Sequence, residues 1–318
     1  QGQPIMSHRS MERQIITTLS KIGRCWFISL FCIVTLLQTG VTAAAENVVL
    51  LSIPGNGAHQ KFSKAFRTKL AQLNPELDII ELPIDEYEPL PENLVVTLGS
   101  RAFKETTRQS GTMFHALISH VLYKEYYPND KTGKYHMVFN QPLERMLRLH
   151  AIVLPQSRDV GVLLGNPFPE IINKLEEQAR IFGKRIVIER VEDNFAESLS
   201  NLLPKIDSLL LLPDSTVINR STINSLVLDS YHKRIPLLGY SMSLVKAGAM
   251  MALYSTPEQL GEDSAHLVAR IISGKRVSIH NSPKQFKVSV NYKLGRVYGI
   301  TIPSEKELHN KIAAGTRK

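Results

Sequence analysis

The chain has 318 residues, of which 43% are hydrophobic and 21% charged, as is usual for a soluble globular protein of one or two domains. Its formal net charge of +9 is spread over interspersed acidic and basic residues, without the basic stripe interleaved with aromatic residues that is typical of nucleic-acid binding, so we expect no nucleic-acid partner. Both cysteines, Cys25 and Cys32, precede residue 46, which excludes disulfides, thiolate nucleophiles and cysteine-ligated metals from the rest of the chain.

The N-terminal segment, residues 1–45, has the pattern of a signal peptide with an N-terminal extension. A basic region up to Arg24 precedes an apolar run at 25–37, and a group of small residues ends at Ala45. This order predicts cleavage near Ala45 and export to the periplasm. The alternative is an uncleaved membrane anchor, although the apolar run is shorter than the ~20 residues that usually span a bilayer.

After residue 46, short apolar runs rich in leucine and β-branched residues alternate with stretches of helical periodicity. We predict strands from the first pattern and helices from the second. In chain order these are a strand at 47–53, a helix at 62–73, strands at 77–81 and 94–98, a helix after Gly99, a strand at 113–118, a helix at 143–153, a strand at 159–164, a helix at 171–182, a strand at 185–191, a helix at 195–203, a strand at 208–212, a helix ending near 232 and a strand at 235–238.

The helix that begins after Thr256 carries the strongest end signals. Thr256 is a suitable N-cap, Pro257 suits the first helical position, and Gln259 completes a capping box. Gly274 is placed to end this helix. A strand at 286–290 and a short helical stretch at 291–298 complete the prediction.

Continuous apolar strands that alternate with helices predict parallel sheets covered on both faces. The strands before residue 240 are many for one sheet, and a break at 154–155 divides them into two sets. The sequence therefore predicts an α/β protein with two Rossmann-like lobes, each containing a parallel sheet, joined by a hinge.

Ser241 is the first candidate for chemistry, because Gly239-Tyr-Ser-Met-Ser243 resembles a nucleophile elbow. That motif needs a second glycine where Ser243 stands, since the strand-to-helix turn is tight. Asp263 and His266 follow in the order of a hydrolase triad, but both fall on one predicted helix. We therefore expect no enzymatic activity, with a serine hydrolase as a remote alternative.

The ten histidines suggest a metal site, but their spacing does not support one. His115 and His120 lie five residues apart, and no His-Glu-x-x-His or His-x-His pattern occurs. We expect scattered histidines and no metal. The turn at 54–57 lacks the glycine patterns of dinucleotide and phosphate loops, so we also expect no cofactor.

Polar loops follow several predicted strands, at 54–59, 99–101, 119–123, 165–167, 213–215 and 240–243. In parallel α/β sheets ligands bind beyond the carboxyl ends of the strands. Two lobes that face each other would form a cleft lined by these loops and closed by hinge motion. Helices that start after Ser100 and Asn166 would direct free N–H groups towards an anion such as a carboxylate.

The C-terminal half resembles the exported substrate-binding proteins of ABC transporters, in the group associated with tryptophan and tyrosine uptake. The resemblance is carried by "LLLPDSTVINRSTINSLV" at 209–227, "IPLLGYSMSLVKAGAMMALYSTPEQLGEDSAHLVARIISGK" at 235–275 and "SPKQFKVSVNYKLGRVYGITIP" at 282–303. The stretch at 139–164 also fits, whereas residues 46–138 match in outline only, through "VVTLGSRA" at 95–102.

This resemblance implies a type I periplasmic-binding-protein fold with three crossovers between two lobes. It places residues 46–155 and a return segment at about 242–282 in lobe 1, and residues 156–241 with 283–318 in lobe 2. It implies ligand contacts from Gly99, Ser100 and Arg101 in the first lobe, and from Asn166, Pro167, Asp214, Ser215, Tyr240 and Ser241 in the second lobe or hinge.

The segment at 111–137 departs from the family pattern and is rich in tyrosine. Its aromatic rings could stack on a planar ligand or pack against the segment itself. The resemblance implies a small-molecule ligand, an amino acid or aromatic compound, and an ABC permease as partner. The alternative keeps the fold but makes the protein a ligand sensor coupled to a membrane receptor or histidine kinase.

Overall fold

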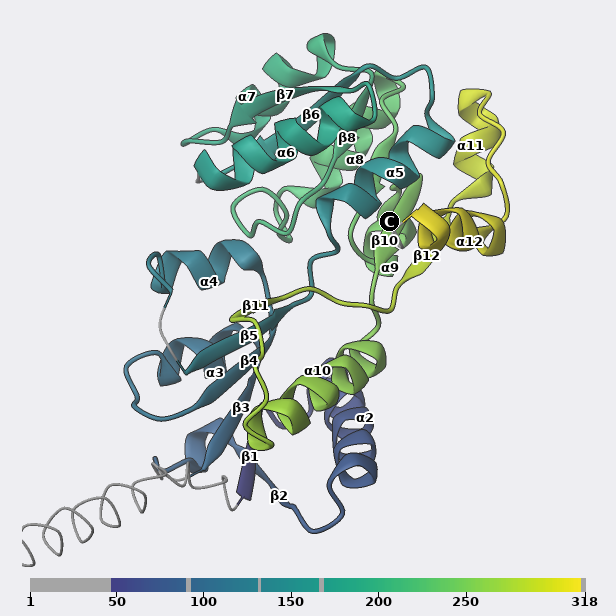
Figure 1. Cartoon of the computed structure of the whole chain (residues 1–318). Helices are drawn as coiled ribbons and strands as arrows, with labels where there is room; N and C mark the ends of the chain where they lie inside the picture. The colour runs from purple at the N-terminus through teal and green to yellow at the C-terminus, as the bar shows by residue number, and fades with distance from the viewer. Residues whose placement is uncertain (1–46, 90–92, 131–132, 166–168, 316–318) are drawn as a thin grey trace, which may run out of the picture. The chain divides into compact units, whose positions relative to one another are not determined.

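We analysed a computed structural model of the chain, which describes residues 47–89, 93–130, 133–165 and 169–315. The predicted signal peptide and its cleavage point therefore lie outside the described residues. The described chain forms two six-stranded sheets, each with helices on its faces (Figure 1). Among the described residues, every helix falls short of the length and apolar composition that a bilayer crossing requires.

The first sheet has the strand order β11-β5-β4-β3-β1-β2, and every neighbouring pair is parallel. Together with its helices it forms what we call the first lobe. Its strands are β1 (Asn47–Ser52), β2 (Asp78–Pro83), β3 (Leu94–Leu98), β4 (Met113–Ile118), β5 (Lys134–Val138) and β11 (His280–Asn281). Its helices are α2 (Gly57–Leu73), α3 (Gly99–Thr106), α4 (His120–Tyr126) and α10 (Pro257–Ile272), with a short 3-10 turn at Ile84–Glu86.

The second sheet has the order β12-β10-β9-β8-β6-β7 and is parallel except for the β10–β12 pair. With its helices it forms the second lobe. Its strands are β6 (Asp159–Leu164), β7 (Arg185–Arg190), β8 (Ser208–Leu210), β9 (Leu237–Gly239), β10 (Met251–Tyr254) and β12 (Lys287–Val290). Its helices are α5 (Leu143–Val153), α6 (Pro169–Ile181), α7 (Phe195–Leu202), α8 (Ile223–His232), α9 (Met242–Ala247), α11 (Tyr292–Tyr298) and α12 (Glu305–Gly315), with a 3-10 turn at Leu203–Lys205.

The predicted α/β class and two-lobed arrangement are confirmed, but the chain divides between the sheets differently from the expected boundaries. Helix α5 packs in the core of the second sheet through Met146, Leu147 and Leu149, although it precedes residue 155. Strand β10 pairs with β9 and β12, so the chain returns to the first lobe after Tyr254 and not at about 242. Burial of α5 and backbone pairing of β10 determine these boundaries, and neither is visible in the local pattern.

The crossings between the lobes lie near residues 139–142, 255–256 and 282–286, and hydrogen bonds join them (Figure 1). The amide of Gln141 donates to Ser255 Oγ at 2.6 Å, and that hydroxyl donates to the carbonyl of Gln285 at 2.5 Å. Arg145, which is 8% exposed, donates to the carbonyl of Pro283 at 2.8 Å and to Oε1 of Gln141 at 3.2 Å. Segments far apart in sequence are thus fixed to one another where they pass between the lobes.

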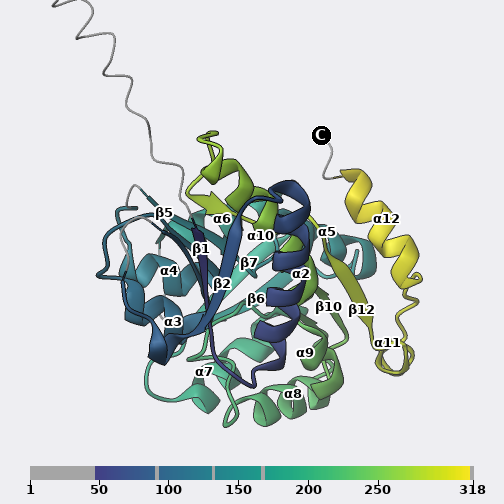
Figure 2. The same ribbon diagram turned by 90° about the horizontal axis from the view of Figure 1, so that it is seen from below.

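Helices α2 and α10 lie side by side on one face of the first sheet (Figures 1 and 2). The amphipathic stripes of both helices supply the core there, including Phe62, Phe66 and Val268. Gly261 permits a close approach of the two backbones, because a Cβ built on it would lie 2.6 Å from the carbonyl oxygen of Phe62 and 3.0 Å from the amide nitrogen of Phe66. Helix α10, which follows the second lobe's β10 in the chain, thereby completes the core of the first lobe.

We expect Gly261→Ala to destabilise the protein, because the added methyl group meets backbone atoms that cannot rotate away. Overpacking of this kind costs about 1–3 kcal/mol, which urea denaturation would measure. Gly57→Ala is the matched control, since a Cβ at Gly57 meets no atom within 4 Å. Equal stability of the two variants would contradict this packing.

Candidate functional site

The first predicted binding segment, Gly99-Ser-Arg101, follows β3 and opens α3. Gly99 adopts φ +79°, and a Cβ built on it would lie 2.9 Å from Nε2 of His59. The Nδ1 atom of His59 accepts a hydrogen bond from the amide of Ile53 at 3.1 Å, so its proton lies on Nε2 in the neutral ring. Burial lowers the pKa of His59, although the Glu81 carboxylate opposes the shift. His59 thus connects the loop after β1 with the start of α3, a contact that the sequence did not reveal.

The guanidinium of Arg101 is committed to carboxylates of its own lobe. It donates to Glu105 Oε1 at 2.9 Å and to Asp85, and its hydrogen bonds to Glu105 and then Asp85 raise the pKa of Arg101. The side chain of Ser100 is exposed at the same helix end. A ligand at this loop would therefore meet the backbone of α3 and Ser100 unless Arg101 exchanged its partners.

In the second lobe, the predicted ligand contact Asp214 holds two loops together. Its Oδ2 accepts from the amide of Gly165 at 2.9 Å and its Oδ1 from the amide of Thr216 at 2.9 Å. The side chain is 7% exposed, whereas Ser215 is exposed. Asp214 therefore sets the position of the loops after β6 and β8. The predicted contacts Asn166 and Pro167 lie outside the described residues.

Tyr240 and Ser241 follow β9, as the sequence predicts, and their roles differ. The Oγ atom of Ser241 accepts from the amide of Leu244 at 3.3 Å and so caps α9. Asp263, the triad candidate, accepts instead from the backbone amides of Lys284 and Gln285 at the third crossing. The side chains of Ser241 and Asp263 thus each bond to backbone amides, and these bonds do not join them to one another.

The ring of Tyr240 lies 6.2 Å from the ring of Phe139, which stands at the first crossing. Burial raises the pKa of Tyr240 to about 12, and the negative charge of Asp214 adds to this shift. Tyr240 is therefore a neutral, half-buried phenol at neutral pH. Tyr240 thus lies near the carboxylate of Asp214, which fixes the loops, and near Phe139 at the first crossing.

The tyrosine-rich segment at 111–137 packs mainly within the first lobe. Tyr123 and Tyr127 are 0% and 2% exposed and form a small core with Phe103 and Ile118. The hydroxyl of Tyr123 donates to the carbonyl of Lys134, and burial raises the pKa of Tyr123. Of the two uses that the sequence left open for these rings, the structure supports packing for Tyr123 and Tyr127.

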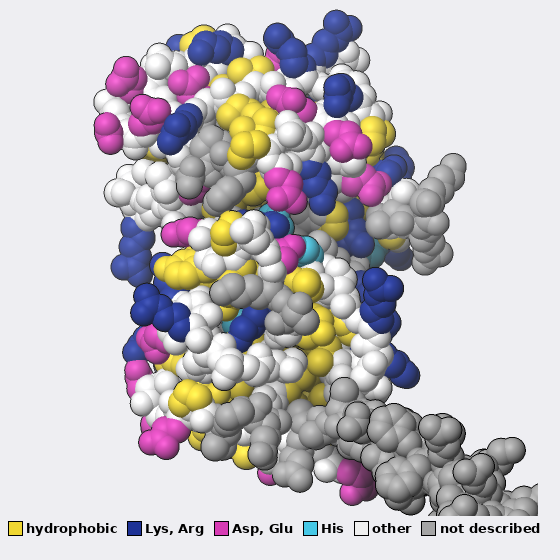
Figure 3. Space-filling model, turned by 60° about the vertical axis from the view of Figure 1, so that its left-hand side comes forward, with side chains coloured by type: hydrophobic (Ala, Val, Ile, Leu, Met, Phe, Trp, Pro, Cys, Tyr) yellow, Lys and Arg dark blue, Asp and Glu magenta, His cyan; other side chains and the backbone are white. Residues whose placement is uncertain are grey.

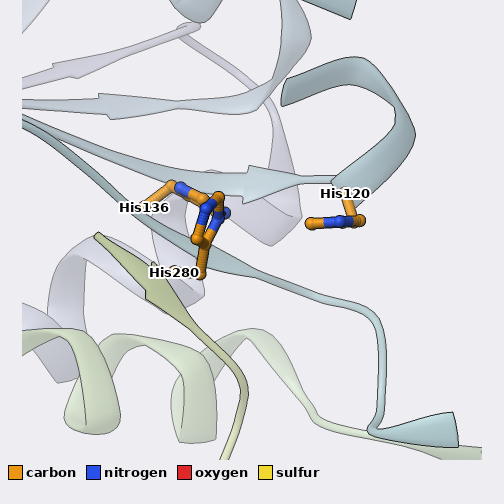
Figure 4. Close-up of side chains that lie close together, drawn as sticks. All are labelled: His120, His136 and His280. Atoms are coloured by element: carbon orange, nitrogen blue, oxygen red, sulfur yellow. The ribbon is translucent and has the colours of Figure 1, made fainter. Parts of the chain in front are cut away.

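Three histidines from distant segments meet beside this core: His120 at the start of α4, His136 in β5 and His280 in β11 (Figure 4). One ring nitrogen of each lies within 4.8 Å of the others. The expectation of scattered histidines is thus wrong for these three, because sheet pairing and not sequence spacing brings them together. His115, in contrast, is buried against Thr97 in the same lobe. Figure 3 shows histidine side chains reaching the surface beside acidic and basic ones.

Comparison with known proteins places this arrangement in a family. The family model described as "ABC transporter substrate binding protein" matches residues 139–309, more than half of the chain. No curated protein sequence gives a significant match. The family match covers the crossings and the second lobe, where the sequence resemblance was strongest.

Solved structures with the same fold include an ABC domain in complex with L-Trp from Streptococcus pneumoniae, at 14% identity and a TM-score of 0.59, over 83% of this chain and 98% of that one. A conserved domain protein from Vibrio cholerae is 16% identical, with a TM-score of 0.58, over 84% of this chain and 98% of that one. A ligand-free, open substrate-binding protein with adhesive properties from Clostridium difficile is 16% identical, with a TM-score of 0.59, over 82% of this chain and 97% of that one. At these identities the likeness establishes the fold, the type I periplasmic-binding-protein fold expected from the sequence.

The raised pKa of Tyr240 predicts a pH dependence. An unfolded tyrosine loses its proton near pH 10, whereas Tyr240 in the folded protein keeps it to about pH 12. The stabilisation that the folded protein gains by keeping Tyr240 protonated is complete below pH ~10. It is lost as the pH rises towards 12, because the unfolded state ionises first. We expect the free energy of unfolding of Tyr240→Phe to fall less steeply than that of the wild type above pH ~10. Parallel pH profiles of the two proteins would contradict the prediction.

Proposed function

We propose that this chain, which belongs to the ABC transporter substrate-binding protein family, is exported to the periplasm and captures a small molecule there for a membrane permease. Members of this family bind small-molecule ligands and deliver them to permeases. The function is then binding without catalysis, in which the ligand stabilises the conformation that it binds best. The predicted contacts in the loops after β3, β6, β8 and β9 are the residues we assign to this binding.

The start of α3 is the observation that carries the proposal. The side chains of Asn56, Ser119 and Ser241 accept hydrogen bonds from the first-turn amides of α2, α4 and α9. Within the described residues, no side chain makes such a bond at α3, which begins with Gly99 directly after β3. The free N–H groups and the positive end of the helix dipole are suited to a ligand anion.

The ligand class that fits these features is an amino acid or a related aromatic compound with a carboxylate. Its carboxylate would accept from the amides of α3, and an aromatic part would lie near Tyr240 and Phe139, whose rings are 6.2 Å apart. The L-Trp in the Streptococcus pneumoniae structure makes aromatic amino acids the first compounds to test. The polar side chains of Asp214 and Ser241 contribute mainly by fixing the loops.

A thermal-shift screen of the purified protein against the natural amino acids and aromatic carboxylates tests this proposal, followed by calorimetric titration of the compounds that stabilise it. A ligand at 100 times its Kd adds about 2.7 kcal/mol of stability, which is a readily measured shift. For a bound carboxylate, we expect Ser100→Pro to weaken binding by about tenfold or more, because it removes one N–H group from the first turn of α3.

Ser100→Ala is the matched control for that substitution, since it loses the hydroxyl but keeps the N–H group. Proline is tolerated in the first turn of a helix, so the fold should survive both changes. Equal affinity of the two variants would show that the α3 amides do not hold the ligand. No stabilisation by any amino acid or aromatic carboxylate would contradict the ligand class.

A further inference from the structure

The histidine cluster of the first lobe has the geometry of a metal site, which nothing in the binding function uses. Nδ1 of His280 lies 3.1 Å from Nε2 of His136. Two imidazole nitrogens bound to one tetrahedral Zn²⁺, at about 2.0–2.1 Å each, are about 3.3 Å apart. The ring nitrogen of His120 lies within 4.8 Å of both, so a small side-chain movement brings it to the same distance (Figure 4).

The surroundings of the cluster hold two of its rings in place. Nε2 of His280 donates to Oδ2 of Asp130 at 2.6 Å, which leaves the lone pair of Nδ1 directed at His136. This is the carboxylate–histidine arrangement that orients metal ligands and raises their basicity. The ring of His136 stacks on Tyr123 at 3.6 Å between centroids, and His136 is fully buried.

Charge near the cluster does not oppose a cation. The ammonium group of Lys124 is close by, but it pairs with Asp130 at 3.3 Å and with Glu170 at 3.7 Å. The ring of His136 is fully buried and that of His120 is partly buried, and a neutral imidazole is the form that binds metal. A hydrogen-bonded chain of Asp130, His280 and His136 would explain these contacts without a metal, but it would not explain why His120 also converges on them.

We propose that His120, His136 and His280 bind a divalent transition-metal ion such as Zn²⁺, with Asp130 orienting His280. Imidazole ligands favour Zn²⁺ and its neighbours Co²⁺, Ni²⁺ and Cu²⁺ over Mg²⁺ and Ca²⁺. A solvent molecule would complete the coordination. Strand β11 pairs with β5 through two residue pairs only and precedes the third crossing, so the metal would fix the returning chain to the first lobe.

The test uses the full chain, stripped with a chelator and titrated with Zn²⁺ alone. Cys25 and Cys32 are replaced by serine in every protein compared, because thiols also bind zinc. We expect one Zn²⁺ per chain by elemental analysis, an increased melting temperature, and the absorption spectrum of tetrahedral coordination with Co²⁺. His120→Ala and His280→Ala should each weaken Zn²⁺ binding by more than a hundredfold, and Asp130→Asn by about 10–100-fold.

His232→Ala and His266→Ala are the matched controls, since both side chains are exposed and outside the cluster. Asp130→Asn separates a metal site from a merely structural role. Asparagine tolerates the positive φ of this position and keeps an oxygen that can accept from His280, so metal affinity should fall by more than the stability of the metal-free protein. Three results would each overturn the proposal: no stoichiometric binding by the parent protein, undiminished binding in His120→Ala, or equal loss in the control variants.

Discussion

The arrangement of this protein depends on the hydrogen bonds that join the three segments passing between its lobes. Gln141, Ser255 and the carbonyl of Gln285 form a chain across these segments, and Arg145 adds the carbonyl of Pro283. Gln141 is 3% exposed and Arg145 8%. Buried polar groups of this kind are costly to leave without partners. The network therefore favours one arrangement of the three segments relative to one another. Both lobes are built from separate stretches of the sequence, and this arrangement determines where the chain enters and leaves each lobe.

The loops that face the proposed ligand are built on the same principle. Their most polar side chains are used to fix the backbone: Asp214 accepts from two loop amides, and Ser241 caps α9. Under the proposed function, a ligand would therefore meet backbone, above all the amides at the start of α3, together with the ring of Tyr240. Fixed amides at a helix end bind an anion without needing a charged side chain, so in the proposed function the fold itself would set recognition.

Much of this architecture could be predicted from the sequence because strong local signals mark it. The apolar runs give β1, β3, β6 and β8, and the capping box of Thr256 and Gln259 gives the start of α10, which is confirmed at both hydrogen bonds. The type I fold followed from the resemblance of the C-terminal half. Strands β5 and β11 were missed, since one is rich in polar residues and the other is two residues long.

The site was predicted less completely, for physical reasons that differ between residues. The assignment of Asp214 and Ser241 to loops after strands was sound, but their hydrogen-bond partners depend on loop conformation. The histidine cluster could not be seen at all, because β11 returns to β5 from 144 residues along the chain. Likewise the return segment at about 242–282 was assigned to the first lobe, because the local pattern does not show that β10 pairs with β9 and β12 of the second sheet.

Urea unfolding of Gln141→Ala beside Gln156→Ala, whose side chain is exposed, measures how far the hydrogen-bonded crossings hold the two-lobed structure together. We expect Gln141→Ala to lose about 1–3 kcal/mol of unfolding free energy, because Arg145 and Ser255 lose a buried partner. Gln156→Ala should stay within about 0.5 kcal/mol of the wild type. Equal stability of the two variants would show that these hydrogen bonds do not hold the lobes together.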